Sequence, residues 1–423
     1  MAHLGLICPE LTGHLNPMMA LGRELKRRGH QVTLIGRPDA QEKTESAGLA
    51  FAAVAEKEFP AGSLAQTTAR LGRLSGFKAM RFTAELLRRA AVTTLDQAPG
   101  AISTAGVDAL LVDQVTPAGE TVAEILHLPF VSVCNALALN SDPALPPAVT
   151  PWRYRPGTIW RWRNALGDFI LRVAARPIIR EINVRRVRHG LPQLAARIPE
   201  APGLAQIAKQ PAFFDYSRER LPDNFHYTGP WHSVDFGDNL DFPWEKLDGR
   251  PLIYASMGTL QNRQGHIFEA IAAACAGLDM QLVLSLGNHD QRLELKLSGA
   301  AIVVPFAPQL ELLRHAALTI THAGLNTALG SLAQGVPMVA IPITNDQPGV
   351  ASRLEWLRVA KVVPPARLSV RRLRVSVRSV LSEAHDRARA QQSKAEIGNI
   401  EGLRLATDIV ERAVETRQPV PRP

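Results

Sequence analysis

Short apolar runs alternate with longer amphipathic stretches along the first part of the chain. A helical pattern over 18–29 follows the first run, and further helical patterns cover 72–95 and 118–126. Asn16 and Pro17 predict where the first helix begins, and Gly29 predicts where it ends. This alternation predicts a mainly parallel, doubly wound α/β sheet. The predicted strands are LGLIC (4–8), QVTLIG (31–36), ALLVD (109–113) and FVSVC (130–134).

The same alternation restarts after a polar, turn-rich segment at 235–251, which predicts a second parallel sheet. We therefore expect an N-terminal domain over 1–234, a linker over 235–250 and a C-terminal domain over 251–400. Residues 401–423 are expected to form a C-terminal helix and tail that pack back on the N-terminal domain. The strands predicted for the second sheet are PLIYASMG (251–258), QLVLSLG (281–287), AIVVPF (301–306), LTITHAG (318–324) and PMVAIPI (337–343).

Composition narrows the class of protein. The chain has 423 residues, 46% hydrophobic and 21% charged, which is ordinary for globular domains and excludes a disordered or disulfide-dense chain. Cys8, Cys134 and Cys275 are far apart with no Cys-x-x-Cys spacing, so a reducing cytoplasm is the expected compartment. The N-terminus lacks a signal-peptide pattern, and no run of 18 apolar residues predicts a transmembrane helix. Any membrane contact is expected to be peripheral.

The net charge of +9 comes mostly from one segment. Between residues 151 and 190 there are ten Arg and two acidic residues, interleaved with Trp152, Trp160 and Trp162. This pattern is typical of an amphipathic segment that rests on an anionic membrane. It equally fits an Arg-rich helix that packs its Trp side chains into its own domain. The segment 152–190 is thus a possible peripheral membrane contact. Nucleic acid is not an expected partner, because no recognition-module signature accompanies the charge.

Candidate chemistry follows the predicted strands, because ligands of open α/β sheets bind at the carboxyl ends of the strands. His14, preceded by Gly13, follows the first strand, and an imidazole there could act as a general base. Asp113 ends another strand, and a carboxylate beside the imidazole would orient the ring. A structural or helix-capping role is the competing interpretation of each residue.

The densest cluster lies at residues 306–347. His322 follows a predicted strand, and Gly324, Asn326 and Thr327 begin the next helix, whose N-terminus could bind a diphosphate. Asp346 and Gln347 follow another strand and suit sugar hydroxyls. A second strand-to-loop turn that could approach phosphate consists of Ser256, Met257, Gly258 and Thr259.

The order of these motifs resembles that of the UDP-glycosyltransferases of the two-domain GT-B fold. The motifs are HLNP, APQ, HAGLNT, GVPM and NDQ, and they span the chain. Two longer segments, VDQVTPAGETVAEILHLPFVSVCNALALN and AIPITNDQPGVASR, resemble the zeaxanthin glucosyltransferase group within that family. The resemblance implies two Rossmann-like domains facing a cleft and transfer of a hexose from a UDP-sugar to a hydroxyl of an apolar acceptor such as a carotenoid.

The resemblance also implies roles for individual residues. His14 would deprotonate the acceptor hydroxyl with help from Asp113, and the transfer would invert the anomeric carbon. The chain contains no Asp-x-Asp, so no metal is expected, and the UDP-sugar is a co-substrate rather than a cofactor. Gln309 would lie near uracil, and Phe306 takes the place where many relatives have tryptophan. His322, Asn326 and Thr327 would hold the diphosphate, and Asp346 with Gln347 the sugar. The donor site would be completed by Gly13, Ser256, Gly258, Thr259, Ala307 and Gly324.

One position departs from the family pattern. Gly330 stands where many relatives have a glutamate that holds the ribose hydroxyls. The missing acceptor could weaken donor binding or alter donor preference. Two alternatives therefore stay open: a glycosyltransferase for a soluble terpenoid, polyketide or phenolic acceptor, and a catalytically weak carotenoid- or lipid-binding protein on the same scaffold.

Overall fold

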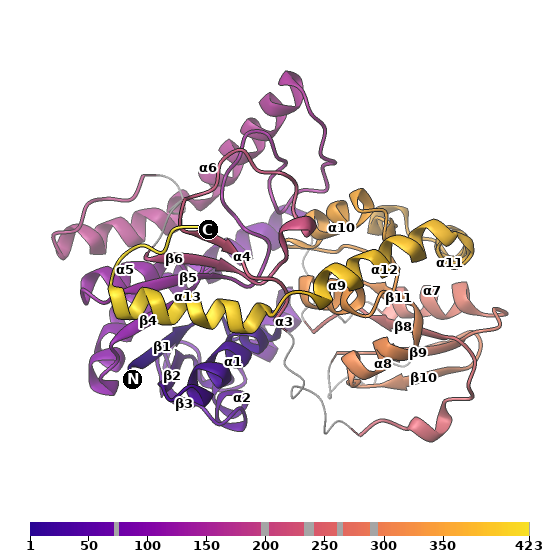
Figure 1. Cartoon of the computed structure of the whole chain (residues 1–423), viewed down its shortest axis with the longest axis horizontal. Helices are drawn as coiled ribbons and strands as arrows, with labels where there is room; N and C mark the ends of the chain where they lie inside the picture. Colours follow the sequence, from indigo (N-terminus) through magenta and orange to yellow (C-terminus); the bar gives the residue numbers. More distant parts are fainter. Residues whose placement is uncertain (72–75, 196–202, 232–240, 260–264, 288–294, 423) are drawn as a thin grey trace.

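The computed structural model describes residues 1–71, 76–195, 203–231, 241–259, 265–287 and 295–422. These residues form two parallel sheets, each covered by helices, that lie side by side (Figure 1). The strand order is β3-β2-β1-β4-β5-β6-β7 in the first sheet and β10-β9-β8-β11-β12-β13 in the second, and every pairing is parallel. The expected architecture of two Rossmann-like α/β domains is confirmed.

The N-terminal domain contains the first sheet. Its central strands are buried along their whole length because helices cover both faces. Its strands are β1 (His3–Ile7), β2 (Gln31–Gly36), β3 (Ala50–Ala53), β4 (Ala109–Asp113), β5 (Phe130–Cys134), β6 (Ala205–Ala208) and β7 (Phe225–Tyr227). Its helices are α1 (Thr12–Arg27), α2 (Gln41–Ser46), α3 (Ser63–Leu71), α4 (Gly76–Ala105), α5 (Pro117–Ile125) and α6 (Thr158–Arg188), with short 3-10 turns η1 (Pro38–Ala40) and η2 (Ala212–Phe214).

The C-terminal domain contains the second sheet. Its strands are β8 (Leu252–Ser256), β9 (Gln281–Ser285), β10 (Ala301–Val304), β11 (Ala316–Thr321), β12 (Met338–Ala340) and β13 (Ala360–Val362). Its helices are α7 (Gly265–Cys275), α8 (Gln309–His315), α9 (Leu325–Ala333), α10 (Gln347–Trp356), α11 (Val370–Ser382) and α12 (Ala384–Gly398), with 3-10 turns η3 (Trp244–Lys246) and η4 (Pro365–Arg367). A final helix, α13 (Gly402–Thr416), follows.

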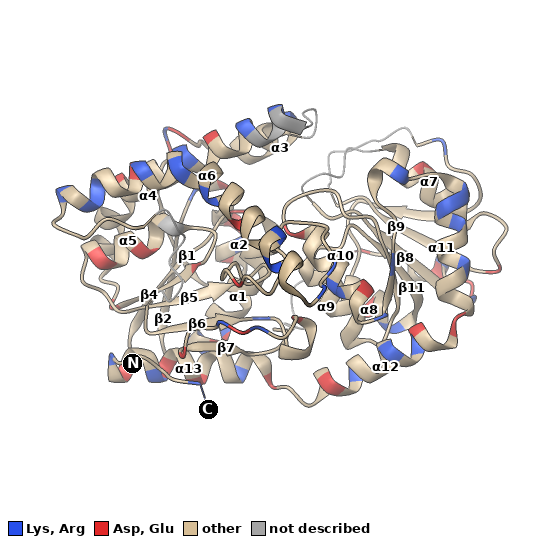
Figure 2. Cartoon of the chain, turned by 90° about the horizontal axis from the view of Figure 1, so that it is seen from above, with Lys and Arg blue, Asp and Glu red and all other residues tan. Residues whose placement is uncertain are grey.

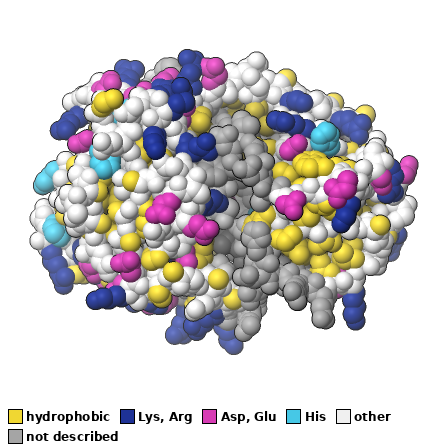
Figure 3. Space-filling model, turned by 90° about the horizontal axis from the view of Figure 1, so that it is seen from below, with side chains coloured by type: hydrophobic (Ala, Val, Ile, Leu, Met, Phe, Trp, Pro, Cys, Tyr) yellow, Lys and Arg dark blue, Asp and Glu magenta, His cyan; other side chains and the backbone are white. Residues whose placement is uncertain are grey.

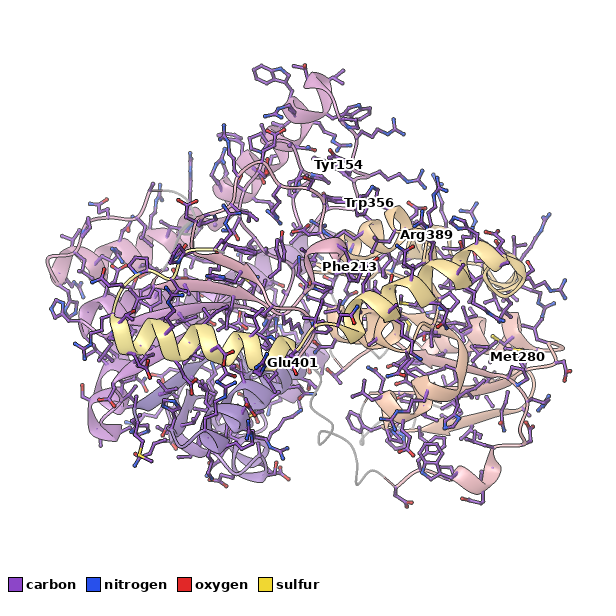
Figure 4. The ribbon with its side chains drawn as sticks, viewed as in Figure 1. Tyr154, Phe213, Met280, Trp356, Arg389 and Glu401 are labelled. Atoms are coloured by element: carbon purple, nitrogen blue, oxygen red, sulfur yellow. The ribbon has the colours of Figure 1, made fainter. Side chains whose placement is uncertain are left out.

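The chain crosses between the domains twice. Of the predicted linker, residues 235–240 lie outside the described residues, and Phe242 already packs in the core of the second domain with Leu252 and Tyr254. At the second crossing, Glu401 marks the point where the chain returns toward the first domain (Figure 4). From there α13 runs along α1 and places Ile409 in the N-terminal core.

Helix α1 begins earlier than its sequence predicts. Its first residue is Thr12 and its N-cap is Leu11, so the predicted start at Asn16 and Pro17 is wrong, whereas the end at Gly29 (φ +96°) is confirmed. Pro17 lies inside the helix, beyond the first turn, so its missing N–H leaves one helix carbonyl without its usual donor. A residue with an N–H at position 17 would bond the carbonyl of Gly13. That carbonyl instead accepts a hydrogen bond from Asn326 of the other domain, at 3.1 Å.

Helix α6 carries the basic segment, and its N-terminal end projects from the rest of the molecule (Figure 1). Lys and Arg positions recur along it (Figure 2), whereas on the face seen from below the two signs of charge are mixed (Figure 3). Of the three tryptophans, Trp152 packs against Gly167 and Trp160 contacts the guanidinium groups of Arg155 and Arg163, whereas Trp162 is 74% exposed. Packing of a Trp side chain into its own domain is thus confirmed for Trp152, whereas contact of the segment with a membrane stays a prediction.

Contacts at the base of this projection reach the C-terminal domain. Tyr154 stacks on Tyr216 with ring centroids 5.0 Å apart, and Tyr216 meets the edge of Trp356 on α10. Figure 4 shows Tyr154 and Trp356 close together where the projection joins the two domains. The Arg153 guanidinium also pairs with Glu355 at 2.7 Å. The projection is therefore attached to both domains.

The structure also bears on the expectations for membrane-spanning helices and for the three cysteines. None of the described helices is both long and apolar enough to cross a membrane. Cys8, Cys134 and Cys275 are buried free thiols.

Candidate active site

One cavity of about 1520 Å³ joins the two domains. It opens between the carboxyl ends of the two sheets and continues into the N-terminal domain between α4 and α6, where its walls are largely apolar. The apolar lining residues there include Leu87, Ala91, Ala98, Leu171, Ala175, Ile178 and Ile179. A cavity with a polar cleft at one end and an apolar chamber at the other suits a polar donor and an apolar acceptor.

His14 lies where the chamber meets the cleft. It belongs to the first turn of α1 rather than to the predicted loop, and its Nδ1 lies 2.8 Å from Oδ2 of Asp113, the buried last residue of β4. A carboxylate only accepts, so Nδ1 carries the proton and Nε2 is the nitrogen that can take one. Asp113 also accepts hydrogen bonds from Asn135 Nδ2 at 2.7 Å and from the Val115 N–H at 3.0 Å. These bonds hold the carboxylate in place.

The electrostatics favour an imidazole that can bind a proton. Burial lowers the pKa of His14, but the charge and the hydrogen bond of Asp113 outweigh burial and raise it above 6.5. Within the described residues, Lys209 also acts on His14 and opposes its protonation. The pair therefore has the geometry and the charge of a general base with its orienting carboxylate.

His322 forms part of the opposite wall of the cleft. It follows β11, and burial lowers its pKa to about 4, so the ring is neutral. Two glycines make room for it, because an ideal Cβ on Gly258 or Gly324 would lie 2.6 or 2.5 Å from Nε2 of His322. Ala323, the next residue after His322, adopts φ +64°, a strained conformation for a residue other than glycine. The strand-to-helix turn thus places the imidazole tightly.

The N-terminus of α9 lies beside His322. Thr327 donates to Gln309 Oε1 at 3.1 Å, which joins α9 to the first residue of α8. Asn326 spans the cleft, donating from Nδ2 to the Gly13 carbonyl and accepting on Oδ1 from Lys209. Gly13 has no positive φ, and a Cβ added to it would meet open space, so it contributes this carbonyl rather than a tight turn.

The remaining predicted donor residues also line the cavity. Asp346 Oδ2 accepts from the Leu137 N–H across the cleft at 3.4 Å. Gln347 is mostly engaged by its own loop, because Oε1 accepts from the N–H groups of Ile343 and Thr344 at 2.8 and 3.0 Å. The other predicted residues found in the lining are Ser256, Gly258, Thr259, Phe306 and Ala307.

Gly330 lies one helical turn into α9 and is buried. A Cβ placed there would contact Leu313 at 3.4 Å, Leu310 at 3.5 Å and Gln309 Nε2 at 3.6 Å, all ordinary contacts. A larger side chain would therefore point toward α8 and Gln309 without a clash at Cβ.

Two site residues were missed by the sequence analysis. Lys209 follows β6 and lines the cavity, and Asn135 follows β5 and holds Asp113. The rule that functional residues follow parallel strands would have found Asn135, because β5 was predicted. It would have found Lys209 only if the four-residue strand AQIA had been recognised.

Comparisons with known proteins define the family to which the chain belongs. The family model described as UDP-glucoronosyl and UDP-glucosyl transferase matches residues 207–390, and that of the glycosyltransferase family 28 N-terminal domain matches residues 12–115. The calicheamicin glycosyltransferase CalG4 has a similar fold, with a TM-score of 0.75 at 20% identity over 99% of this chain and all of that one. With the relatives below, these matches show that the chain belongs to the UDP-glycosyltransferases of the GT-B fold.

Among these enzymes the chain is similar to zeaxanthin glucosyltransferases. The one from Pantoea ananas is 33% identical over 99% of this chain and 98% of its own length. The one from Pseudescherichia vulneris is 33% identical over 84% of each chain. The protein is accordingly a glycosyltransferase that uses a UDP-sugar donor.

Proposed function

We propose that this enzyme transfers glucose from UDP-glucose, with inversion, to a hydroxyl of a carotenoid such as zeaxanthin. The observation that carries the proposal is the position of the His14–Asp113 pair, where an apolar chamber and a polar cleft join in one cavity. The similarity to two zeaxanthin glucosyltransferases supports the choice of sugar and acceptor.

The proposed mechanism is a direct displacement. The acceptor oxygen attacks the anomeric carbon as His14 Nε2 takes its proton, the new C–O bond forms, and the bond from that carbon to the diphosphate oxygen breaks with its electron pair. Asp113 stabilises the imidazolium and keeps the ring oriented, 2.8 Å away. The N-terminus of α9 and the neutral His322 would hold the diphosphate.

The other predicted roles fit the cavity but need adjustment. Gln309 and Phe306 would lie near the base, and Asp346 near the sugar. Gln347 would mainly position the loop before α10, because its Oε1 accepts two backbone N–H groups there. We expect no metal; among the described residues, no three carboxylate, thiol or imidazole groups cluster as a set of metal ligands.

We also propose that α6 docks the enzyme on an anionic membrane, where an apolar acceptor resides. Apart from Leu171, the exposed apolar residues near its N-terminal end recur every three or four positions and so form one helix face. Leu171 is also exposed and lines the chamber, but it lies on a different side of the helix from this face. The exposed apolar residues on this part of α6 are Ile159, Trp162, Leu166, Phe169, Ile170, Leu171 and Val173.

The positive charge of the basic segment favours an anionic lipid surface over other apolar partners. Arg155, Arg176 and Arg180 are exposed, and no ion pair among the described residues includes them. Each cation near an anionic bilayer contributes about 1 kcal/mol, and the exposed Trp162 and Phe169 side chains would add apolar contact.

The first experiment measures transfer itself. The purified protein is incubated with UDP-glucose and zeaxanthin in detergent micelles, beside a panel of soluble terpenoid, polyketide and phenolic acceptors, and the products are weighed by mass spectrometry. We expect a hexose on zeaxanthin that is absent with His14→Ala, whose binding of UDP should be nearly unchanged. Transfer only to a soluble acceptor would replace the carotenoid, and UDP binding without any transfer would point to a different sugar or acceptor. Failure to bind UDP at all would favour a binding protein.

The second experiment tests the membrane surface. The double variant Trp162→Glu with Phe169→Glu should no longer float with vesicles that contain anionic lipid. A matched control, Val375→Glu with Leu405→Glu, replaces exposed apolar residues elsewhere and should float like the original protein. Equal flotation of both variants would remove α6 as the docking face. Loss of self-association in the first variant, with unchanged flotation, would make α6 an interface between two copies.

A further inference from the structure

Lys209 lines the cavity between the two domains, and the family pattern assigned it no role. It follows β6 at the carboxyl end of the first sheet, is 3% exposed and lines the cavity. A buried lysine is costly unless its charge is compensated. Within the described residues no carboxylate pairs with it directly, although Asp346 and Asp113 are near enough to favour its charged form.

The neighbour of Lys209 identifies the place it occupies. Its ammonium donates to Oδ1 of Asn326, the second residue of α9. The first residues of a helix present free N–H groups and the positive end of the dipole, which is where an anion binds. Lys209 therefore brings a side chain from the N-terminal domain to the anion-binding end of a helix in the C-terminal domain.

Donor capacity remains on this ammonium. A protonated lysine has three N–H donors, and among the described residues only Asn326 accepts one. We propose that Lys209 donates to the diphosphate of the bound nucleotide sugar and neutralises the charge that develops on it as it leaves. This inference rests on the proposed donor site. It adds a catalytic residue from the domain opposite to the one that holds the nucleotide.

The chemistry requires such a charge. When the bond from the anomeric carbon to the diphosphate breaks, its electron pair stays on the β-phosphate oxygen, and a fixed cation there stabilises the transition state more than the ground state. Burial lowers the pKa of Lys209 to about 7, while Asp346 and Asp113 oppose that shift. The negative charge of the diphosphate would hold the lysine protonated. His14 also faces Lys209, and its protonation late in the reaction would add positive charge nearby.

A purely structural role is the competing explanation. Lys209 and Asn326 come from different domains, so the hydrogen bond between them could simply hold the cleft closed. The two roles differ in what they predict for ligands of different charge. A residue that binds diphosphate matters for UDP and little for uridine, whereas a residue that only closes the cleft matters equally for both.

Calorimetry can separate these roles without any acceptor. Affinities for uridine, UMP and UDP are measured for the original protein and for Lys209→Met, which keeps the length of the side chain but removes the charge. We expect UDP affinity to fall about 10- to 100-fold, as for loss of a charge-assisted hydrogen bond, with uridine affinity unchanged. Lys209→Arg should recover part of the loss. Lys43→Met is the control, since Lys43 also lines the cavity but lies on α2.

The outcomes separate failure of the proposed role of Lys209 from failure of the proposed donor site. Equal losses for uridine and UDP, or unchanged affinity for UDP, would overturn the role of Lys209. If Lys209→Met does not fold, Lys209→Arg serves as the test. A large loss of affinity of Lys209→Arg for both uridine and UDP would also overturn the role of Lys209. Failure of the original protein to bind UDP at all would instead overturn the donor site.

A chelator supplies the complementary test. If Lys209 provides the compensating charge, turnover of the original protein should persist in excess EDTA, whereas Lys209→Met should lose turnover with or without Mg²⁺. Loss of turnover in EDTA would assign the compensating charge to a metal ion and overturn the proposal.

Discussion

At the scale of single residues, the hydrogen bond between His14 and Asp113 determines the pH dependence. A general base must be neutral to accept a proton, and Asp113 raises the pKa of His14 above 6.5. The rate kcat/KM should therefore fall as the pH drops through a midpoint above 6.5. Asp113→Asn keeps the size of the side chain but removes its charge, so this midpoint should move to lower pH, and kcat should fall about 10²- to 10⁴-fold.

The measurement is a pH profile of kcat/KM for the two proteins. Asn135→Ala provides a control that removes one hydrogen bond to Asp113 without removing its charge. Its midpoint should change less than that of Asp113→Asn. A midpoint that is the same in all three proteins would show that another group limits the acid side of the profile.

Gly330 gives a second prediction at this scale. Because a Cβ there makes only ordinary contacts and points toward Gln309, Gly330→Glu should supply an acceptor for the ribose hydroxyls and tighten UDP binding about tenfold. Gly330→Ala adds the same Cβ without the carboxylate, so UDP affinity should stay unchanged. Calorimetry with UDP and 2′-deoxy-UDP checks both. Equal or weaker binding of UDP to Gly330→Glu would show that this position does not face the ribose.

At the scale of elements, the turn from β11 to α9 depends on the close packing of Gly324 against His322. Gly324→Ala would place a Cβ 2.5 Å from Nε2 of His322, so the ring or the turn must move. We expect loss of UDP affinity and of turnover, and a destabilisation of about 1–3 kcal/mol from overpacking. Gly100→Ala on α4 is the matched control, since nothing lies within 4 Å of the added Cβ, and it should stabilise by about 0.5–1 kcal/mol.

Urea unfolding and UDP titration measure both effects. If Gly324→Ala binds UDP with normal affinity, then His322 does not take part in donor binding, whether or not the variant protein is destabilised.

Sequence patterns predicted some elements better than others. Long apolar runs such as ALLVD and LIYAS gave buried strands because helices cover both faces of each sheet. The short strands β3, β6, β7 and β13 were missed, since three or four residues carry too little pattern. The helix predicted over 72–95 is in part α4, which starts at Gly76 and continues to Ala105 through Pro99; residues 72–75 lie outside the described residues.

At the scale of the whole molecule, a buried ion pair joins the domains. Arg353 on α10 contacts Asp215 Oδ1 through Nε and Nη2 at 2.8 and 2.7 Å, and Arg218 contacts the other carboxylate oxygen at 2.7 Å. Burial alone would raise the pKa of Asp215, but the two guanidinium groups lower it well below 3.8. Asp215 therefore stabilises the fold above that pH, and this contribution is lost as the pH falls toward the lowered pKa.

Removing one arginine should be costly. Arg353→Met leaves the pair incomplete in a buried place, so we expect a loss of about 3–5 kcal/mol in the free energy of unfolding at pH 7. Arg153→Met removes the exposed pair with Glu355 between the same domains and should cost about 0–1 kcal/mol. Urea unfolding measures both. Equal small losses would mean that the domains do not depend on the buried pair.

The sequence by itself determined the two α/β halves and the kinds of side chain at the strand ends, because strand length, helix periodicity and turn residues are local properties. It also contained the ordered motifs by which the family was recognised. Only the tertiary structure brought His14 to Asp113 across 99 positions, placed Asn326 at the Gly13 carbonyl and buried Lys209 at the start of α9. These contacts join segments from different strands or domains, and their distances depend on how the two sheets pack rather than on any local pattern.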